Sequence, residues 1–216
     1  MLQATTPSAS SGTDTDAMLY VLYGTETGNS QSLASSASAA AERAGLHARV
    51  LGLDQISARE LVKVRHAIFI VSTTGDGEMP YTAAHFWDAL SADDFPQIKQ
   101  LRYGVLALGD TAYDEFCAAG VALDKRLTMC GAVRLVERGD CDHDFEATAV
   151  AWLDHTIEAF AQSIHADGPA GNEVGVVFSL KESGRPRHSA WIHDLDADLA
   201  VGPLVFHASQ FRQLLP

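Results

Sequence analysis

A short apolar run that ends in a glycine-bearing loop and leads straight into a helix constrains the fold of this chain most strongly. Residues 20–30 read Tyr-Val-Leu-Tyr-Gly-Thr-Glu-Thr-Gly-Asn-Ser. In a strand–loop–helix unit, the N–H groups and the positive dipole end of the helix point into the loop and favour a phosphate. The loop has neither the Gly-Lys-Ser/Thr ending nor the G-x-G-x-x-G pattern of common nucleotide loops. Its polar side chains suit one monophosphate held by neutral donors, although a simple helix cap uses the same residue types. These side chains belong to Thr25, Thr27, Asn29 and Ser30.

Strand-like and helix-like segments alternate from residue 18 to about residue 161. Short apolar runs predict strands at 18–23, 49–53, 67–72, 103–108 and 133–137. Apolar spacing and capping signals predict helices at 30–44, 57–64 and 145–161, one that starts at Pro80 and one that stops at Gly131. Such alternation implies a parallel sheet that is buried on both faces. Five units of this length predict a flavodoxin-like α/β domain, a doubly wound five-stranded parallel sheet in the order 2-1-3-4-5 with helices on both faces.

The two ends of the chain differ in composition from the alternating part. Residues 1–17 are rich in Ser, Thr and Ala and lack the pattern of a signal peptide, so we expect a disordered lead-in. Residues 18–161 are expected to form one domain, followed by a linker at 162–173. Residues 174–216 are expected to form a short β-like tail, with strands at 174–180 and 189–195, that is too small for a core of its own.

Charge and cysteine content narrow the functional classes. The formal net charge of -13 speaks against nucleic acid as a partner. It favours docking to a basic protein, or it simply keeps the protein in solution. The odd number of cysteines, Cys117, Cys130 and Cys141, argues against a disulfide framework and favours a reducing cytoplasm. The nine histidines show no paired ligand spacing, so no metal site is expected. No apolar run approaches the roughly 18 residues of a membrane span, so no membrane partner is expected.

Glycine-bearing loops follow the first, third and fourth predicted strands. In an open parallel sheet, ligands bind beyond the carboxyl ends of the strands, where the strand order reverses. The predicted order places these three loops side by side at that edge. The second and third loops offer many backbone groups and little positive charge, which suits a flat heterocycle, and Tyr113 could lie across such a ring. A phosphate and a flat ring in one site predict FMN as the cofactor.

The residues of these loops resemble the three FMN loops of the diflavin reductases. They read Thr-Glu-Thr-Gly-Asn at 25–29, Ser-Thr-Thr-Gly-Asp-Gly-Glu at 72–78 and Leu-Gly-Asp-Thr-Ala-Tyr-Asp-Glu-Phe-Cys at 108–117. The third is most similar to the flavoprotein component of NADPH–sulfite reductase, with the pattern L-G-D-T-x-Y-x-x-F-C. The resemblance covers residues 18–161. Thr74 stands where cytochrome P450 reductases carry an aromatic residue, which favours the sulfite reductase branch.

The resemblance implies a set of cofactor-binding residues. The phosphate would be held by Thr25, Glu26, Thr27, Gly28, Asn29 and Ser30. One side of the flavin ring would be lined by Ser72, Thr73, Thr74, Gly75 and Gly77. The other side would be closed by Leu108, Gly109, Asp110, Tyr113, Phe116 and Cys117, with Tyr113 stacked on the ring and Asp142 as an acid at the rim. No side chain is expected to act as a catalytic acid, base or nucleophile.

We therefore expect an FMN electron-transfer protein that passes electrons between an FAD- and NADPH-binding reductase and a redox partner such as a haem or iron–sulfur protein. The sequence shows no further glycine-rich cofactor loop after residue 161, so we expect either a free-standing carrier or a truncated reductase. An acidic face beside the flavin would dock the partner, or it is solvated surface. Its carboxylates are Asp114, Glu115, Asp140, Asp142 and Asp144. The alternatives are an FMN-dependent quinone or disulfide reductase of the same fold, and a binding domain without flavin.

Overall fold

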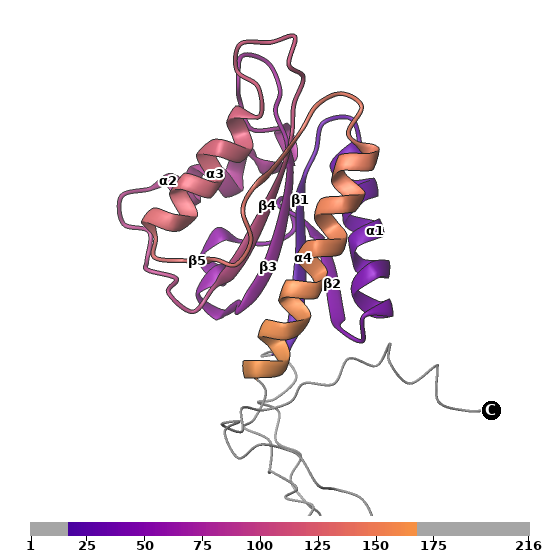
Figure 1. Cartoon of the computed structure of the whole chain (residues 1–216). Coiled ribbons are helices and arrows are strands. Elements are labelled where there is room, and N and C mark those ends of the chain that lie inside the picture. Colours follow the sequence, from indigo (N-terminus) through magenta and orange to yellow (C-terminus); the bar gives the residue numbers. More distant parts are fainter. Residues whose placement is uncertain (1–16, 168–216) are drawn as a thin grey trace, which may run out of the picture. The chain divides into compact units, whose positions relative to one another are not determined.

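A computed structural model describes residues 17–167, which contain a parallel sheet with helices on both faces (Figure 1). The strands are β1 (Met18–Gly24), β2 (His47–Gly52), β3 (His66–Ser72), β4 (Arg102–Leu108), β5 (Val133–Arg134) and β6 (Gly139–Cys141). Their order is β2-β1-β3-β4-β5, and β6 also pairs with β4. The predicted fold class and strand order are confirmed. The predicted tail strands at 174–180 and 189–195 lie outside the described residues.

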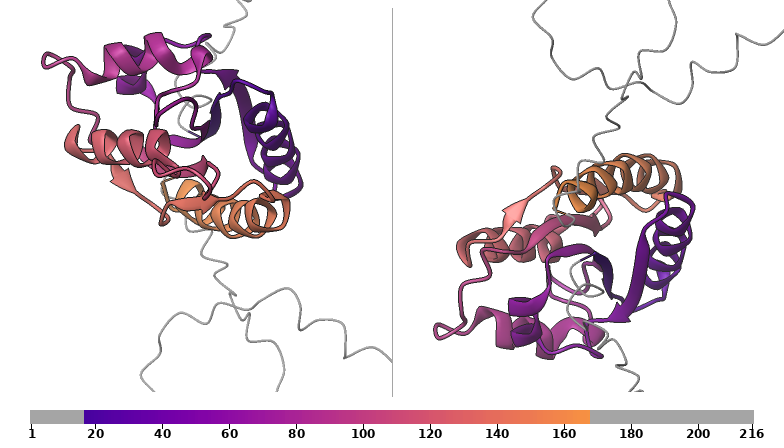
Figure 2. Two further views of the ribbon diagram at one scale, coloured as in Figure 1. Left: turned by 90° about the horizontal axis from the view of Figure 1, so that it is seen from above. Right: turned by 90° about the horizontal axis from the view of Figure 1, so that it is seen from below.

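The helices divide between the two faces of the sheet (Figure 2). They are α1 (Asn29–Arg43), α2 (Ala84–Ser91), α3 (Ala118–Met129) and α4 (Glu146–Asp167), with short 3-10 helices η1 (Ala58–Lys63) and η2 (Tyr81–Ala83). Helices α1 and α4 lie side by side on one face, and α2 and α3 cover the other. The helix predicted to start at Pro80 begins as a 3-10 turn and becomes α-helical only at Ala84.

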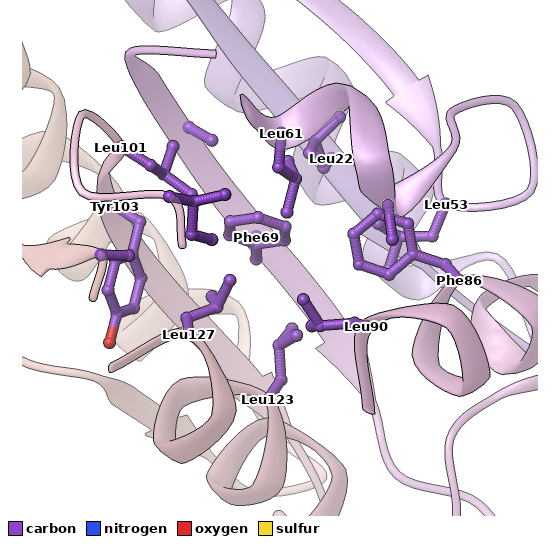
Figure 3. Close-up of a cluster of buried hydrophobic side chains, with 14 of the residues drawn as sticks. Leu22, Leu53, Leu61, Phe69, Phe86, Leu90, Leu101, Tyr103, Leu123 and Leu127 are labelled. Atoms are coloured by element: carbon purple, nitrogen blue, oxygen red, sulfur yellow. The ribbon is translucent and has the colours of Figure 1, made fainter. Parts of the chain in front are cut away.

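Strand β3 lies at the centre of both cores because its side chains alternate between the two faces. Phe69 packs into the cluster under α2 and α3, with Leu90 and Leu123 (Figure 3). Ile68 and Ile70 pack into the cluster under α1 and α4. Every residue of β3 except Ser72 is buried. Burial on both faces explains why this strand is a continuous apolar run in the sequence instead of an alternating pattern.

The predicted fifth strand at 133–137 is wrong in its extent. The chain forms β5 over two residues, leaves the ladder, and returns as β6 farther along β4. Between them, the Glu137 carbonyl accepts a hydrogen bond of 2.9 Å from the Trp152 indole instead of continuing the ladder. Arg134 and Arg138, on either side of this break, both reach the buried Asp124 of α3, with N···O distances of 2.7 and 3.3 Å. These side-chain contacts connect both sides of the break to α3.

The last helix is longer than predicted. Helix α4 continues to Asp167, so residues 162–167, which were expected to begin the linker, are helical. Ile164 is buried against the core under α1 and α4, and this packing extends the helix past the expected end at residue 161. The rest of the predicted linker and both chain ends lie outside residues 17–167.

Candidate cofactor site

A cavity of about 520 Å³ opens at the carboxyl ends of β1, β3 and β4. Four segments surround it: loop one (residues 24–30), loop two (73–79), loop three (109–117) and the rim loop (142–145). The lining residues that the sequence predicted are Thr27, Asn29, Ser72, Thr73, Gly75, Leu108, Gly109, Asp110 and Tyr113. Glu115, His143 and Phe145 line it as well. The structure therefore brings the three predicted loops to one place, at the edge where the strand order reverses.

The other predicted residues belong to these four segments but do not line the cavity. They are Thr25, Glu26, Gly28, Ser30, Thr74, Gly77, Phe116, Cys117 and Asp142. Several of them shape the loops, as their contacts below show. His143 and Phe145 were missed as site residues although they follow Asp142 at the same edge of the sheet, so the position of that acid was the signal that could have found them.

Loop one presents the start of α1 to the cavity. Gly28 is the N-cap residue with φ 95°, a left-handed conformation that glycine adopts without strain. Its N–H donates to the Thr25 hydroxyl at 2.9 Å, and its carbonyl accepts from Ser32 N–H at 3.0 Å. The N–H groups at the start of the helix have no acceptor within it, and the first turn carries no acidic residue. An anion at this point meets N–H donors and no opposing carboxylate from the helix.

Two buried hydroxyl groups, one in loop one and one on the cavity wall, have no hydrogen-bond partner among the described residues. They are Ser30 Oγ, in the first turn of α1, and Ser72 Oγ, at the end of β3. Ser30 is fully buried, and Ser72 lines the cavity. A buried hydroxyl without a partner costs free energy, and a ligand with acceptor atoms would remove that cost. The residues present therefore fit a phosphate-bearing polar ligand such as FMN.

Loop two is a tight turn closed by a bridge between Thr74 and Glu78. Gly75 and Gly77 have φ angles of 52° and 103°, which residues with a Cβ atom rarely adopt. A Cβ atom on Gly77 would lie 3.1 Å from the Glu115 Cβ atom of loop three. Gly77 therefore allows the two loops to pack closely, and it does not line the cavity.

Loop three is anchored to the sheet through Cys117, which is buried and has φ 56°. Its sulfur lies 3.5 Å from the Ala107 carbonyl and 3.7 Å from the Cys141 carbonyl. Burial raises the pKa of the Cys117 thiol to about 12, so it stays protonated and serves as a structural donor. A Cβ atom on Gly109 would lie 2.6 Å from the Cys117 nitrogen, so only glycine fits there. The Asp110 carboxylate accepts from the Ala112 N–H at 2.8 Å and shapes the loop.

The rim loop is tied to loop three through Asp142. Its carboxylate accepts from the Thr111 N–H at 2.9 Å, the Thr111 hydroxyl at 2.5 Å and the His143 N–H at 2.7 Å. The hydrogen bonds from Thr111 hold the pKa of Asp142 far below its usual value. His143 Nδ1 lies 3.3 Å from Asp142, and this hydrogen bond raises the pKa of the imidazole, as does the charge of Asp144. Asp110, Asp142 and His143 have ligand atoms within 4.8 Å of one another, but the existing bonds to Asp142 account for this arrangement without a metal.

The cavity wall includes acidic and aromatic side chains and one histidine. Within residues 17–167, the ionisable groups on the cavity wall other than Tyr113 are Asp110, Glu115 and His143, and no lysine or arginine lines the cavity. Phe145 and Tyr113 add aromatic surface, and Tyr113 is 67% exposed. This combination suits a planar group that rests on an aromatic side chain and remains accessible from outside.

Among residues 17–167, no helix is both long enough and apolar enough to cross a membrane.

Comparison with known proteins gives the family. The sequence matches the Flavodoxin family over residues 21–152. It is 37% identical over 143 residues to the sulfite reductase [NADPH] flavoprotein alpha-component of Bacillus subtilis (strain 168), a match that covers 66% of this chain and 24% of the relative. A protein of the same name from Vibrio cholerae is 32% identical over 184 residues, 85% of this chain and 29% of the relative. The chain therefore spans less than a third of the length of these curated relatives.

Solved structures agree with this assignment. The Streptococcus pneumonia TIGR4 flavodoxin superposes with a TM-score of 0.62 at 27% identity, over 68% of this chain and 99% of that protein. A flavodoxin variant from Pseudomonas aeruginosa gives a TM-score of 0.59 at 26% identity, over 66% of this chain and 98% of that protein. FMN, the cofactor expected from the sequence, is confirmed as the cofactor of this domain. By fold, by the site at its carboxyl edge and by sequence, the chain belongs to the flavodoxin family.

Proposed function

We propose that this domain carries electrons between a reductase that binds FAD and NADPH and a redox protein, with FMN held in the cavity at the carboxyl edge. The observation that carries the proposal is that one cavity joins the N-terminus of α1 to an exposed aromatic edge at Tyr113. The helix end suits the phosphate of FMN, and the exposed edge leaves the ring within reach of another protein. An electron carrier needs both a firmly held cofactor and an accessible one.

The residues around the cavity divide the work of binding. Thr27, Asn29 and the unpartnered hydroxyl of Ser30 would hold the phosphate, together with the first N–H groups of α1. Loop two and loop three would flank the ring through the lining residues Ser72, Thr73, Gly75, Leu108, Gly109, Asp110 and Tyr113. FMN supplies the redox chemistry, and the chain binds it, orients it and sets the charge around it.

The acidic face beside the cavity would dock the partner. Asp114, Glu115 and Asp144 are exposed. Asp140 is also exposed, but Arg138 holds it at 2.6 Å, and Thr111 holds Asp142, so these two carboxylates mainly support the loops. We therefore assign docking to the first three. Complementary charge raises the rate of encounter more than it tightens binding, which suits a short-lived electron-transfer complex.

Three free, buried cysteines are compatible with a reducing cytoplasm, and we propose that location.

The purified protein tests the proposal directly. We expect a yellow protein with about one FMN per chain and no FAD, and a stepwise reduction with passage of single electrons to a one-electron acceptor. A colourless protein that does not take up added FMN would contradict the proposal. Rapid two-electron turnover with a quinone or a disulfide, and none with a one-electron acceptor, would instead favour a reductase of the same fold.

A further inference from the structure

The main chain of loop one is held by a side chain from outside the loop. The Thr25 N–H donates to the Thr82 hydroxyl at 2.8 Å, and the same hydroxyl donates to the Thr25 carbonyl at 2.9 Å. One hydroxyl therefore satisfies both main-chain groups of Thr25, as a neighbouring strand would. Next to it, the Tyr81 N–H donates to the Glu26 carboxylate at 3.0 Å. Thr82 and Tyr81 belong to η2, which follows loop two.

These contacts are connected through Thr25 to the N-terminus of α1. The Thr25 hydroxyl accepts from the Gly28 N–H at 2.9 Å, and Gly28 is the N-cap residue of that helix. At the start of the loop, a Cβ atom on Gly24 would lie 2.8 Å from the Ala83 Cβ atom. Gly24 thus lets loop one press against the segment that carries Thr82. The position of the helix N-terminus is linked through Thr25 to one hydroxyl on η2.

We propose that Thr82 is a positioning residue for the phosphate of FMN, a role that rests on the proposed function. Thr82 does not line the cavity, so it acts through Thr25 and Gly28 and not by touching the ligand. The N–H groups at the start of α1 bind a phosphate well only if the loop holds them in one orientation. Without the Thr82 hydroxyl, loop one loses the partner of Thr25, and the phosphate site is no longer preformed. The ring-binding loops keep their own hydrogen bonds, because Thr73 N–H still reaches the Leu108 carbonyl and Gly109 N–H the Cys141 carbonyl.

The test compares FMN with riboflavin, which lacks the phosphate, in variants of the full chain. Thr82→Val keeps the shape of the side chain and loses the hydroxyl, so the affinity for FMN should fall about tenfold while that for riboflavin changes less than about twofold. Thr82→Ser keeps the hydroxyl and should restore the affinity for FMN. Thr156→Val is the matched control, because Thr156 is a buried threonine on α4 whose hydroxyl has no partner within residues 17–167. Both affinities follow from flavin fluorescence on addition of apoprotein, and the affinity for inorganic phosphate, from the amide signals of Gly28 and Asn29, should fall with that for FMN.

The outcomes separate this proposal from the proposed function. If the wild-type protein binds no FMN, the proposed function fails. If it binds FMN and Thr82→Val binds FMN and phosphate equally well, the positioning role fails alone. An equal loss for FMN and riboflavin, or a failure of both Thr82→Val and Thr82→Ala to fold, would make Thr82 a requirement of the fold and would overturn the proposal. A loss confined to FMN and phosphate, with rescue by Thr82→Ser, supports it.

Discussion

The two sides of the cavity use opposite chemistry. Loop one surrounds the N-terminus of α1 with hydroxyls and main-chain N–H groups, and its only charged side chain, Glu26, is bonded to the Tyr81 N–H. Loop three and the rim loop carry Asp110, Asp114, Glu115 and the acids around His143. Neutral, preorganised donors hold a permanent anion without adding mobile charge. Ionised groups at the opposite side act over longer distances, on partners and on the bound ring. On the proposed function, the cofactor would be retained at the neutral side and would exchange electrons at the charged side.

The largest effect should come from removing a donor on the neutral side. Thr27 lines the cavity, so Thr27→Ala should weaken FMN binding by about 1–3 kcal/mol, because a hydrogen bond to a charged group is lost. Titration of apoprotein with FMN measures the loss, and riboflavin is the control. Equal losses for both ligands would break the comparison, because loop one would then not be the phosphate side.

A smaller effect, on rate and not on affinity, should come from the charged side. Asp114→Asn together with Asp144→Asn, at two exposed acids that do not line the cavity, should slow electron transfer to a basic acceptor such as a cytochrome c at low salt, and should flatten the salt dependence of that rate. The Debye length falls from about 10 Å at 0.1 M salt to about 3 Å at 1 M, enough to screen such steering. Stopped-flow absorbance of the acceptor measures the rate. The affinity for FMN should not change, and a rate that ignores both salt and the substitutions would make these acids ordinary solvated surface.

The smallest effect concerns His143 and pH. Its hydrogen bond to Asp142 and the nearby acids raise its pKa in the folded state, so the protonated form stabilises the fold. This stability is fully present below the unfolded value of about 6.5 and is lost as the pH rises through the folded pKa. His143→Gln should therefore be less stable than the wild type at pH 5.5 and equally stable at pH 8.5, as measured by urea unfolding. Asp142 does not interfere, because its lowered pKa confines its own contribution to changes below about pH 4.

A second histidine provides the control for this measurement. His155 is exposed on α4 and does not line the cavity, so His155→Gln should follow the wild type at both pH values. If His143→Gln behaves in the same way, the contact with Asp142 adds nothing to the stability, and the rim acts only on ligands and partners.

The sequence predicted the sheet and the meeting of the three loops, because β1, β3 and β4 are largely apolar runs and a glycine-bearing loop follows each of them. It did not predict the division of the fifth strand. That feature depends on Asp124, a polar residue within a helical pattern, which is buried because Tyr103, Arg134 and Arg138 all bond to it. Such contacts join residues distant in the sequence, and no local pattern records them.

The site shows the same limit on a smaller scale. The motifs identified Cys117 and Gly77 correctly as part of the loops, but only the packing distances show that both shape the cavity from behind its wall. Their assignment as direct cofactor contacts stays a prediction. The domain boundaries also stay a prediction, apart from the longer helix α4.

The short strand β6 has a consequence for register. Only the three residues of β6 form this part of the ladder with β4, yet their register is fixed. A Cβ atom on Gly139 would lie 2.7 Å from the Trp152 ring, and Cys141 is fully buried. A slip by one residue would reverse which side chains face the core. Cys141 would no longer face the core, and Asp142 would no longer lie within hydrogen-bond distance of Thr111. The charged side of the cavity is therefore held in register with β4 by one glycine and one cysteine.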